Sequence, residues 1–216
     1  MFTKEPVDEL PTTSTKNVVY PMEELQVDEK CVEKILQNLR PSKSPGTDGL
    51  HPRVLKELPG ILATLLTMIF KSSLAMNSIP ESWKTANITP LFKKGDKRDP
   101  SNYRPISLTS VVCKVLERLI RDHLMNHLKM NNLLSNKQYG FIPGRSLSLQ
   151  LLTVMNDWTK TLDKGELVDV IYLDFLKAFD SVPHRRLIHK LKSLGVHTQI
   201  IQWIENFLTG RTQKVV

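Results

Sequence analysis

Apolar residues recur three and four positions apart along most of this chain, a spacing that predicts amphipathic helices. Asp28 and Ser110 stand where helix N-caps belong, just ahead of such rows, and Pro52 suits the first position of a helix. The row from Gly60 to about Met76 is apolar nearly all round, so we expect that helix at the centre of the core. Further helices are predicted at 147–162, 184–194 and 198–208.

Three stretches predict strands rather than helices. Residues 85–92 alternate loosely between apolar and polar side chains, and residues 212–216 look like the start of a strand. Residues 167–175 form an apolar run of strand length, which predicts a buried strand. A few strands among many helices place the chain in the α/β class, as a helix-rich α+β protein.

Composition divides the chain into two parts. Residues 1–26 are polar and contain three prolines and a Thr/Ser run, so we expect a flexible leader there. Residues 27–216 are long enough to bury one sizeable core, given that 40% of the chain is apolar.

The spacing of cysteines and histidines argues against a zinc site. Cys31 and Cys113 stand far apart with no CxxC partner, which also disfavours a disulfide framework. We expect both as small apolar residues on helix faces. His123 and His127 are four residues apart on a predicted helix, but no third ligand stands nearby.

The charge balance points to an anionic partner. The formal net charge is +8 and the pI is about 9.5. Nucleic acid is the first candidate for such a partner and an anionic membrane the second. The longest apolar stretch, 61–70, is too short to span a bilayer, and the N-terminus carries no secretory signal. We therefore expect an intracellular protein, in the cytoplasm or nucleus, without a membrane partner.

A carboxylate stands at the end of the predicted buried strand. Asp174 is a poor core residue there and a good ligand for a hard metal ion, although an acid that caps the following turn is the plainer interpretation. Phe179, five residues on, is by itself typical of a core aromatic. Asp180 is expected to cap the next helix or to make a hydrogen bond.

A charged loop, 93–100, follows the predicted strand 85–92 and leads to Arg104 on a returning extended segment. This arrangement suits phosphate capture, because Lys93 and Lys94 supply point charges and Arg104 a planar fork of donors. A solvated hairpin of mixed charge is the alternative, since two aspartates dilute the patch.

A second loop, 138–146, combines glycines with hydrogen-bond donors. Gly140 lets a nucleic-acid backbone come close, and Gln138 and Arg145 offer donors to it. A surface turn with a stray arginine is the alternative interpretation.

Four segments resemble, in the same order, the motifs of reverse transcriptases from non-long-terminal-repeat (LINE-type, jockey-like) retrotransposons. Residues 170–180 (VIYLDFLKAFD) are similar to the first catalytic motif, and residues 102–108 (NYRPISL) to the fingers motif. Residues 138–146 (QYGFIPGRS) resemble the template-grip motif, and residues 43–49 (KSPGTDG) a motif that precedes the fingers. The resemblance implies an RNA-directed DNA polymerase that copies RNA into DNA by two-metal nucleotidyl transfer.

The resemblance also implies roles at the nucleotide. Asp174 is implied as the catalytic carboxylate and as a ligand of Mg²⁺ (or Mn²⁺). Phe179 is implied under the sugar, where a rigid ring leaves no room for a 2′-hydroxyl and so favours deoxynucleotides. Arg104 is implied to contact the incoming triphosphate, with help from Lys93 or Lys94.

At the template, the resemblance places Gln138 and Gly140 near the strand and Arg145 on a phosphate. The implied partners are an RNA template, a DNA primer and deoxynucleoside triphosphates.

The implied architecture is an incomplete right-hand polymerase, with fingers at about 80–165 and the start of the palm at about 166–216. The family's later palm helix and its hairpin of paired aspartates are not found after Gly210, so we expect residues 1–216 to be a fragment that is inactive by itself. The alternatives are a non-catalytic nucleic-acid-binding protein derived from a decayed element and, further off, a helical interaction protein.

Overall fold

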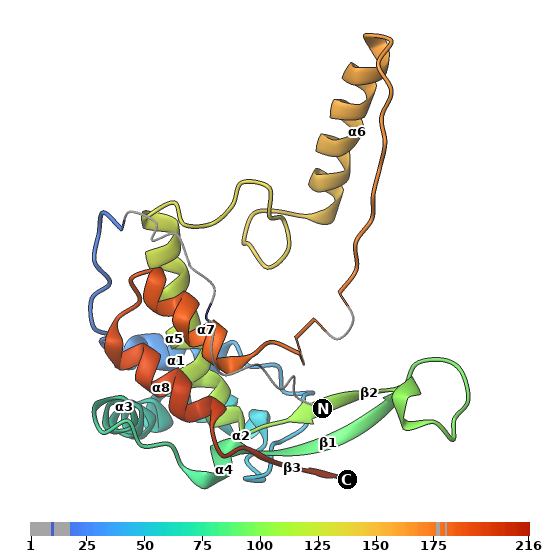
Figure 1. Cartoon of the computed structure of the whole chain (residues 1–216). Coiled ribbons are helices and arrows are strands. Elements are labelled where there is room, and N and C mark those ends of the chain that lie inside the picture. Colours follow the sequence, from blue (N-terminus) through green and yellow to red (C-terminus); the bar gives the residue numbers. More distant parts are fainter. Residues whose placement is uncertain (1–9, 11–17, 176–177, 180) are drawn as a thin grey trace.

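The chain folds into a helical body with a small sheet at one side and a projecting arm (Figure 1). The computed structural model describes residue 10 and residues 18–175, 178–179 and 181–216. Within these residues the α-helices are α1 (Glu29–Gln37), α2 (Pro52–Glu57), α3 (Pro59–Ala75), α4 (Glu81–Lys84), α5 (Val111–Met130), α6 (Leu147–Asp163), α7 (His184–Ser193) and α8 (Thr198–Leu208). The strands are β1 (Thr85–Phe92), β2 (Tyr103–Leu108) and β3 (Thr212–Val215), and η1 (Pro100–Asn102) is a short 3₁₀ helix. A helix-rich chain with a small sheet is compatible with the expected α+β class.

The helices begin where the local signals place them. The Asp28 carboxylate accepts a hydrogen bond from the Cys31 amide at 3.0 Å, and Ser110 Oγ accepts one from the Cys113 amide at 3.2 Å. Each bond satisfies an amide that the first turn of a helix leaves without a backbone partner. Pro52 is the first residue of α2, where no amide donor is needed. The predicted starts of these three helices are confirmed.

The core lies between α1, α3, α5, α7 and α8. Leu36, Phe70 and Leu116 come from three different helices and are completely buried, and Trp203 of α8 lies in the same cluster. The indole Nε1 of Trp203 donates a hydrogen bond to Ser73 Oγ at 3.1 Å. The one polar atom of this large side chain is therefore satisfied inside the core.

The apolar helix α3 contributes to the core but is buried on one side only, so the prediction that it lies at the centre of the core was wrong. Phe70 and Leu74 face the core, whereas Ile61, Leu65 and Met68 are 69%, 53% and 64% exposed. The reason is geometric, because α1, α2 and α8 pack against α3 from one side. In the described part of the chain, no helix combines the length and apolar character needed to cross a bilayer.

β1 is the central strand of the sheet, whose order is β2-β1-β3. β1 and β2 form an antiparallel hairpin in which Leu91 pairs with Arg104. β3 runs parallel to β1, and Thr85 pairs with Thr212. The strands predicted at 85–92 and 212–216 are thus confirmed.

Residues 167–175, predicted as a buried strand, are neither a strand nor buried. They form an extended segment in which Leu167, Ile171 and Leu173 are 92%, 83% and 85% exposed. A strand exists only through hydrogen bonds to a neighbouring strand, and the three described strands pair with one another. This segment therefore has the composition of a strand but lies outside the sheet that the described residues form.

The segment 167–175 belongs to the arm, by which we mean α6 together with residues 164–175. α6 confirms the helix predicted at 147–162, but none of its residues is buried. The chain reverses after α6 at Gly165, whose φ of +76° suits a residue without a Cβ. The returning segment then leads back toward α7 and the body (Figure 1).

Residues 18–27 lie against the helical body, although a flexible leader was predicted as far as residue 26. Asn131 Oδ1 accepts hydrogen bonds from the amides of Val19 and Tyr20 at 2.9 and 2.8 Å, and Asn131 Nδ2 donates one to the Tyr20 carbonyl at 3.0 Å. Met22 and Val27 are buried in the core. The packed part of the chain therefore includes residues 18–26. Residues 1–9 and 11–17 of the predicted leader, and Asp180, lie outside the described residues.

The two cysteines differ in their surroundings. Cys113 on α5 is buried, as predicted for a small apolar residue, whereas Cys31 on α1 is exposed and not part of an apolar face. Burial, reinforced by the nearby carboxylate of Glu117, raises the pKa of the Cys113 thiol far above its ordinary value.

Candidate nucleotide and nucleic-acid site

The hairpin of β1 and β2 carries the first group of predicted site residues. Its loop closes through a hydrogen bond from the Lys93 amide to the Asn102 carbonyl at 2.9 Å. The side chains of Lys93, Lys94 and Arg104 are exposed. The structure thus keeps these three cations on one supersecondary element, as the sequence predicted.

The two aspartates of the loop shape its backbone instead of neutralising the lysines. Asp96 Oδ1 accepts a hydrogen bond from the Arg98 amide at 2.9 Å, and Asp99 Oδ1 accepts one from the Ser101 amide at 2.8 Å. The hydrogen bonds from Ser101 lower the pKa of Asp99. Within the described residues, neither aspartate forms an ion pair. The cations of the loop therefore remain available to an outside anion.

An aromatic pair stiffens the base of this hairpin. The rings of Phe92 and Tyr103 meet edge to face with their centroids 5.5 Å apart. The Tyr103 hydroxyl donates to the Lys97 carbonyl at 2.9 Å, and Lys97 Nζ lies 5.7 Å from the centre of the Phe92 ring. Arg104 follows Tyr103 directly, so the pair fixes the backbone from which Arg104 projects.

Arg145 holds its own loop together, a role that the sequence did not indicate. Its Nη1 donates to the carbonyls of Ser135 at 2.8 Å and Asn136 at 3.2 Å, and also to the carbonyl of Gln138. Gln138 Nε2 in turn donates to the Gly140 carbonyl at 3.2 Å. The two predicted template residues therefore organise the backbone around Gly140, and contact with a template phosphate stays a prediction.

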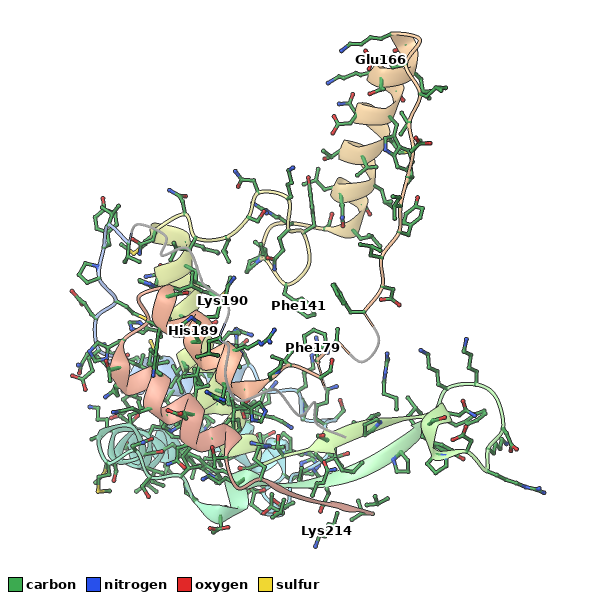
Figure 2. The ribbon with its side chains drawn as sticks, in the orientation of Figure 1. Phe141, Glu166, Phe179, His189, Lys190 and Lys214 are labelled. Atoms are coloured by element: carbon green, nitrogen blue, oxygen red, sulfur yellow. The ribbon has the colours of Figure 1, made fainter. Side chains whose placement is uncertain are left out.

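The loop 138–146, which we call the template-grip loop after the motif that it resembles, contacts the segment of Phe179 through two phenylalanines. Phe141 and Phe179 meet edge to face, with centroids 5.7 Å apart and an interplanar angle of 82° (Figure 2). Both rings are otherwise exposed, at 86% and 78%. The sequence singled out Phe179 but not Phe141, whose φ of +62° shows that the loop forces its backbone into a conformation unusual for a bulky residue.

Asp174 lies on the exposed return segment of the arm. No group of three His, Cys, Asp or Glu side chains able to hold a metal comes together in the described part of the chain. Among the same residues, no ion pair joins Asp174 to Arg104, Lys93 or Lys94. The described residues therefore show no direct contact between the Asp174 carboxylate and the cations of the hairpin.

The histidines of α5 are engaged in packing interactions. His123 Nε2 is hydrogen-bonded to the Glu23 carbonyl at 2.9 Å, and His127 Nε2 to the Leu194 carbonyl at 2.8 Å. Because a carbonyl only accepts, these ring nitrogens carry the protons, and the rings link α5 to the N-terminal segment and to the turn after α7.

The chain is similar to known reverse transcriptases. The family model for reverse transcriptase (RNA-dependent DNA polymerase) matches residues 92–215. The RNA-directed DNA polymerase from mobile element jockey of Drosophila funebris is 34% identical over 181 residues, which are 83% of this chain and 20% of that protein. The probable RNA-directed DNA polymerase from transposon BS of Drosophila melanogaster is 32% identical over 192 residues, 88% of this chain and 21% of that protein. The chain thus spans about a fifth of the length of these curated relatives.

Proposed function

Because this chain belongs to the reverse transcriptase (RNA-dependent DNA polymerase) family, we propose that it forms the fingers and the first part of the palm of a retrotransposon polymerase that copies RNA into DNA. The observation that carries the proposal is the family match over 92–215, which includes the loop and the second strand of the hairpin, residues 138–146 and Asp174. The partners in this proposal are an RNA template, a DNA primer and deoxynucleoside triphosphates.

The hairpin would bind the triphosphate. Arg104 offers a planar set of donors to phosphate oxygens, and Lys93 and Lys94 add positive charge from the loop beside it. The loop aspartates support this proposal, because their carboxylates are hydrogen-bonded to backbone amides and do not pair with the lysines. This arrangement orients an anion without needing the loop to refold.

The template-grip loop and Phe179 would position the template and the sugar. Arg145 fixes the loop from inside, so that Gly140 presents backbone without a side chain to an approaching strand. Phe179 would lie under the sugar of the incoming nucleotide and exclude a 2′-hydroxyl by contact. Its ring already packs against Phe141 of the same loop.

The described residues do not fit a site for two divalent ions by themselves, because one exposed carboxylate cannot hold two cations and no ligand cluster forms among them. Mg²⁺ or Mn²⁺ belongs to the proposal only as an ion that Asp174 and further carboxylates would share. Taken alone, residues 1–216 are better suited to binding nucleic acid than to catalysis. The specific observation is that the hairpin cations are exposed, while no metal-binding group of side chains forms in the described part of the chain.

The proposal is tested in a chimaera, in which this chain replaces the matching segment of the Drosophila funebris jockey polymerase. Primer extension on an RNA template should be measured for the chimaera and for its Asp174→Asn variant. Asp174→Asn should reduce extension by at least about 100-fold, as loss of a charge-stabilising group at a reacting centre does, while binding of the primer–template stays unchanged. Asp169→Asn, five residues earlier on the same exposed segment, is the matched control and should leave extension near its starting level.

Equal loss in both variants would indicate damage to the arm and would contradict a specific role for Asp174. Full activity of Asp174→Asn would overturn the assignment of the catalytic carboxylate.

A further inference from the structure

α7 turns a face made of cations toward solvent. Its apolar residues, Leu187, Ile188 and Leu191, pack in or against the core cluster. Helical geometry then places the remaining side chains on the opposite side. We call this side the α7 cationic face, and its members are the exposed residues Arg185, Arg186, Lys190 and Lys192.

This face carries a concentrated charge of one sign. The ten residues of α7 include no Asp or Glu. In the part of the chain that the structure describes, neither Lys190 nor Lys192 forms an ion pair. α1 offers the contrast, because its lysines at 30 and 34 alternate with glutamates at 29 and 33. α7 therefore carries an excess of positive charge that α1 lacks.

We propose that the α7 cationic face binds the phosphate backbone of RNA, as a second contact distinct from the β1–β2 hairpin. The proposed function supplies only the class of the partner. The face itself extends over seven residue steps from Arg185 to Lys192, about 10 Å at about 1.5 Å per step. Arginine and lysine on phosphate position a strand without reading its sequence, so binding here is independent of sequence.

The order of segments along the chain connects the α7 cationic face with the Phe141–Phe179 contact. Phe179 stands on the segment that leads directly into α7, and Figure 2 shows His189 and Lys190 further along the helix. RNA held near the Phe141–Phe179 contact therefore has the α7 cationic face as the next surface along the chain. The β1–β2 hairpin is a different element, so the cations of each surface can be substituted without changing the other.

An anionic membrane fits this helix poorly. Helices that bind a bilayer surface insert an apolar face between the lipids. The apolar face of α7 is already used inside the protein, where Ile188 and Leu191 are buried. Lys190 and Lys192 are exposed and form no ion pair among the described residues, and such charges suit a phosphate backbone.

The test measures how salt affects the affinity of residues 1–216 for a labelled single-stranded RNA of about 20 nucleotides and mixed sequence, between about 50 and 200 mM salt. Lys190→Gln with Lys192→Gln removes two cations of the face. The matched control, Lys30→Gln with Lys34→Gln, removes two cations from α1. Lys93→Gln with Lys94→Gln removes two from the hairpin. Thermal melts of all four proteins show whether each variant keeps the fold.

Each phosphate contact with single-stranded RNA contributes about 0.7 to the log–log salt slope. The α7 variant should therefore lose up to about 1.4 of that slope, and the α1 control should match the parent protein. An unchanged salt slope in the α7 variant would overturn the inference. If the slope fell only in the hairpin variant, the inference would be wrong while the proposed function would stand. RNA binding unchanged in the α7 variant, with loss of binding to phosphatidylserine vesicles, would assign the face to membranes instead. A lost slope in the α7 variant, together with a chimaera insensitive to Asp174→Asn, would keep the inference and reject the proposed catalysis.

Discussion

Gly46 lies directly against the backbone at Ser110, the residue that caps α5: a Cβ added to Gly46 would fall 2.5 Å from the Ser110 amide nitrogen. Gly46 is buried and belongs to the segment 43–49. Thr47 Oγ1, next in the same segment, donates to the Ser82 carbonyl at 3.1 Å. Close packing at this point thus requires a glycine. The contact holds the segment 43–49 against the start of α5, the longest described helix.

Gly46→Ala should destabilise the chain by about 1–3 kcal/mol, because the atoms it would strike are backbone and do not rotate away. Displacing Ser110 would also weaken the cap of α5. Gly60→Ala is the control, since its nearest neighbour, Glu33 Oε1, is 4.0 Å away and alanine suits a helix. Urea unfolding should show a lower midpoint for Gly46→Ala alone. An equal midpoint for both variants would contradict the close contact.

The second prediction concerns Asn131, which anchors the N-terminal segment through Val19 and Tyr20. Asn131→Ala removes these hydrogen bonds from the segment, and each is worth about 1 kcal/mol net. Local opening of residues 18–27 should then become at least about fivefold more frequent. Limited proteolysis by a glutamate-specific protease, which cuts after Glu23 or Glu24, measures that opening.

Asn126→Ala provides the control for this experiment. Asn126 is an exposed residue of α5, the helix that ends just before Asn131, and its side chain is paired only with Met130 Sδ at 3.5 Å in the described residues. Cleavage near Glu23 should stay at the parent rate. If both variants were cleaved equally fast, the effect would come from α5 and not from the anchor.

The third prediction separates the two cysteines. Cys31 is exposed and Cys113 is buried, with a pKa raised by desolvation and by Glu117. Only the thiolate is alkylated, so iodoacetamide should label Cys31 in the folded protein and reach Cys113 only after unfolding. Mass spectrometry of Cys31→Ser should find no label until urea is added. Labelling of both cysteines at equal rates in the folded protein would contradict the burial of Cys113.

Helix starts and the strand at 85–92 could be predicted from the sequence, because interactions between residues close in the chain determine them. Asp28 and Ser110 cap helices because a short oxygen-bearing side chain satisfies a nearby amide, and that relationship lies within three residues of the chain. The alternation in 85–92 likewise predicts a strand, and β1 forms there.

Relationships between distant residues were not predictable in this way. Residues 167–175 have a strand's composition, but whether they form a strand depends on a partner elsewhere. The ordered segment 18–27 was missed because its anchor, Asn131, lies more than 100 positions away. The roles expected of Asp174 and Arg104 rest on motif resemblance and stay predictions, whereas the distance between the two residues is set by the whole fold.

The ring contact between Phe141 and Phe179 allows an effect on loop packing to be distinguished from an effect on the choice between ribonucleotides and deoxynucleotides. Phe179→Val in the chimaera should raise ribonucleotide incorporation relative to deoxynucleotide incorporation, because a smaller side chain opens space where a 2′-hydroxyl would lie. The discrimination lost when a contact of this size is removed is about 10–200-fold. Competition between the two nucleotides during primer extension measures it.

Phe141→Val is the matched control, because it breaks the same edge-to-face pair from the other side. Both variants lose about 0.5–1.5 kcal/mol of aromatic pairing, so both should loosen the template-grip loop to a similar extent. If Phe179 acts on the sugar, only Phe179→Val changes the nucleotide preference. If the preference shifts equally in both, the ring pair merely positions the loop, and the assignment of Phe179 to sugar discrimination is wrong.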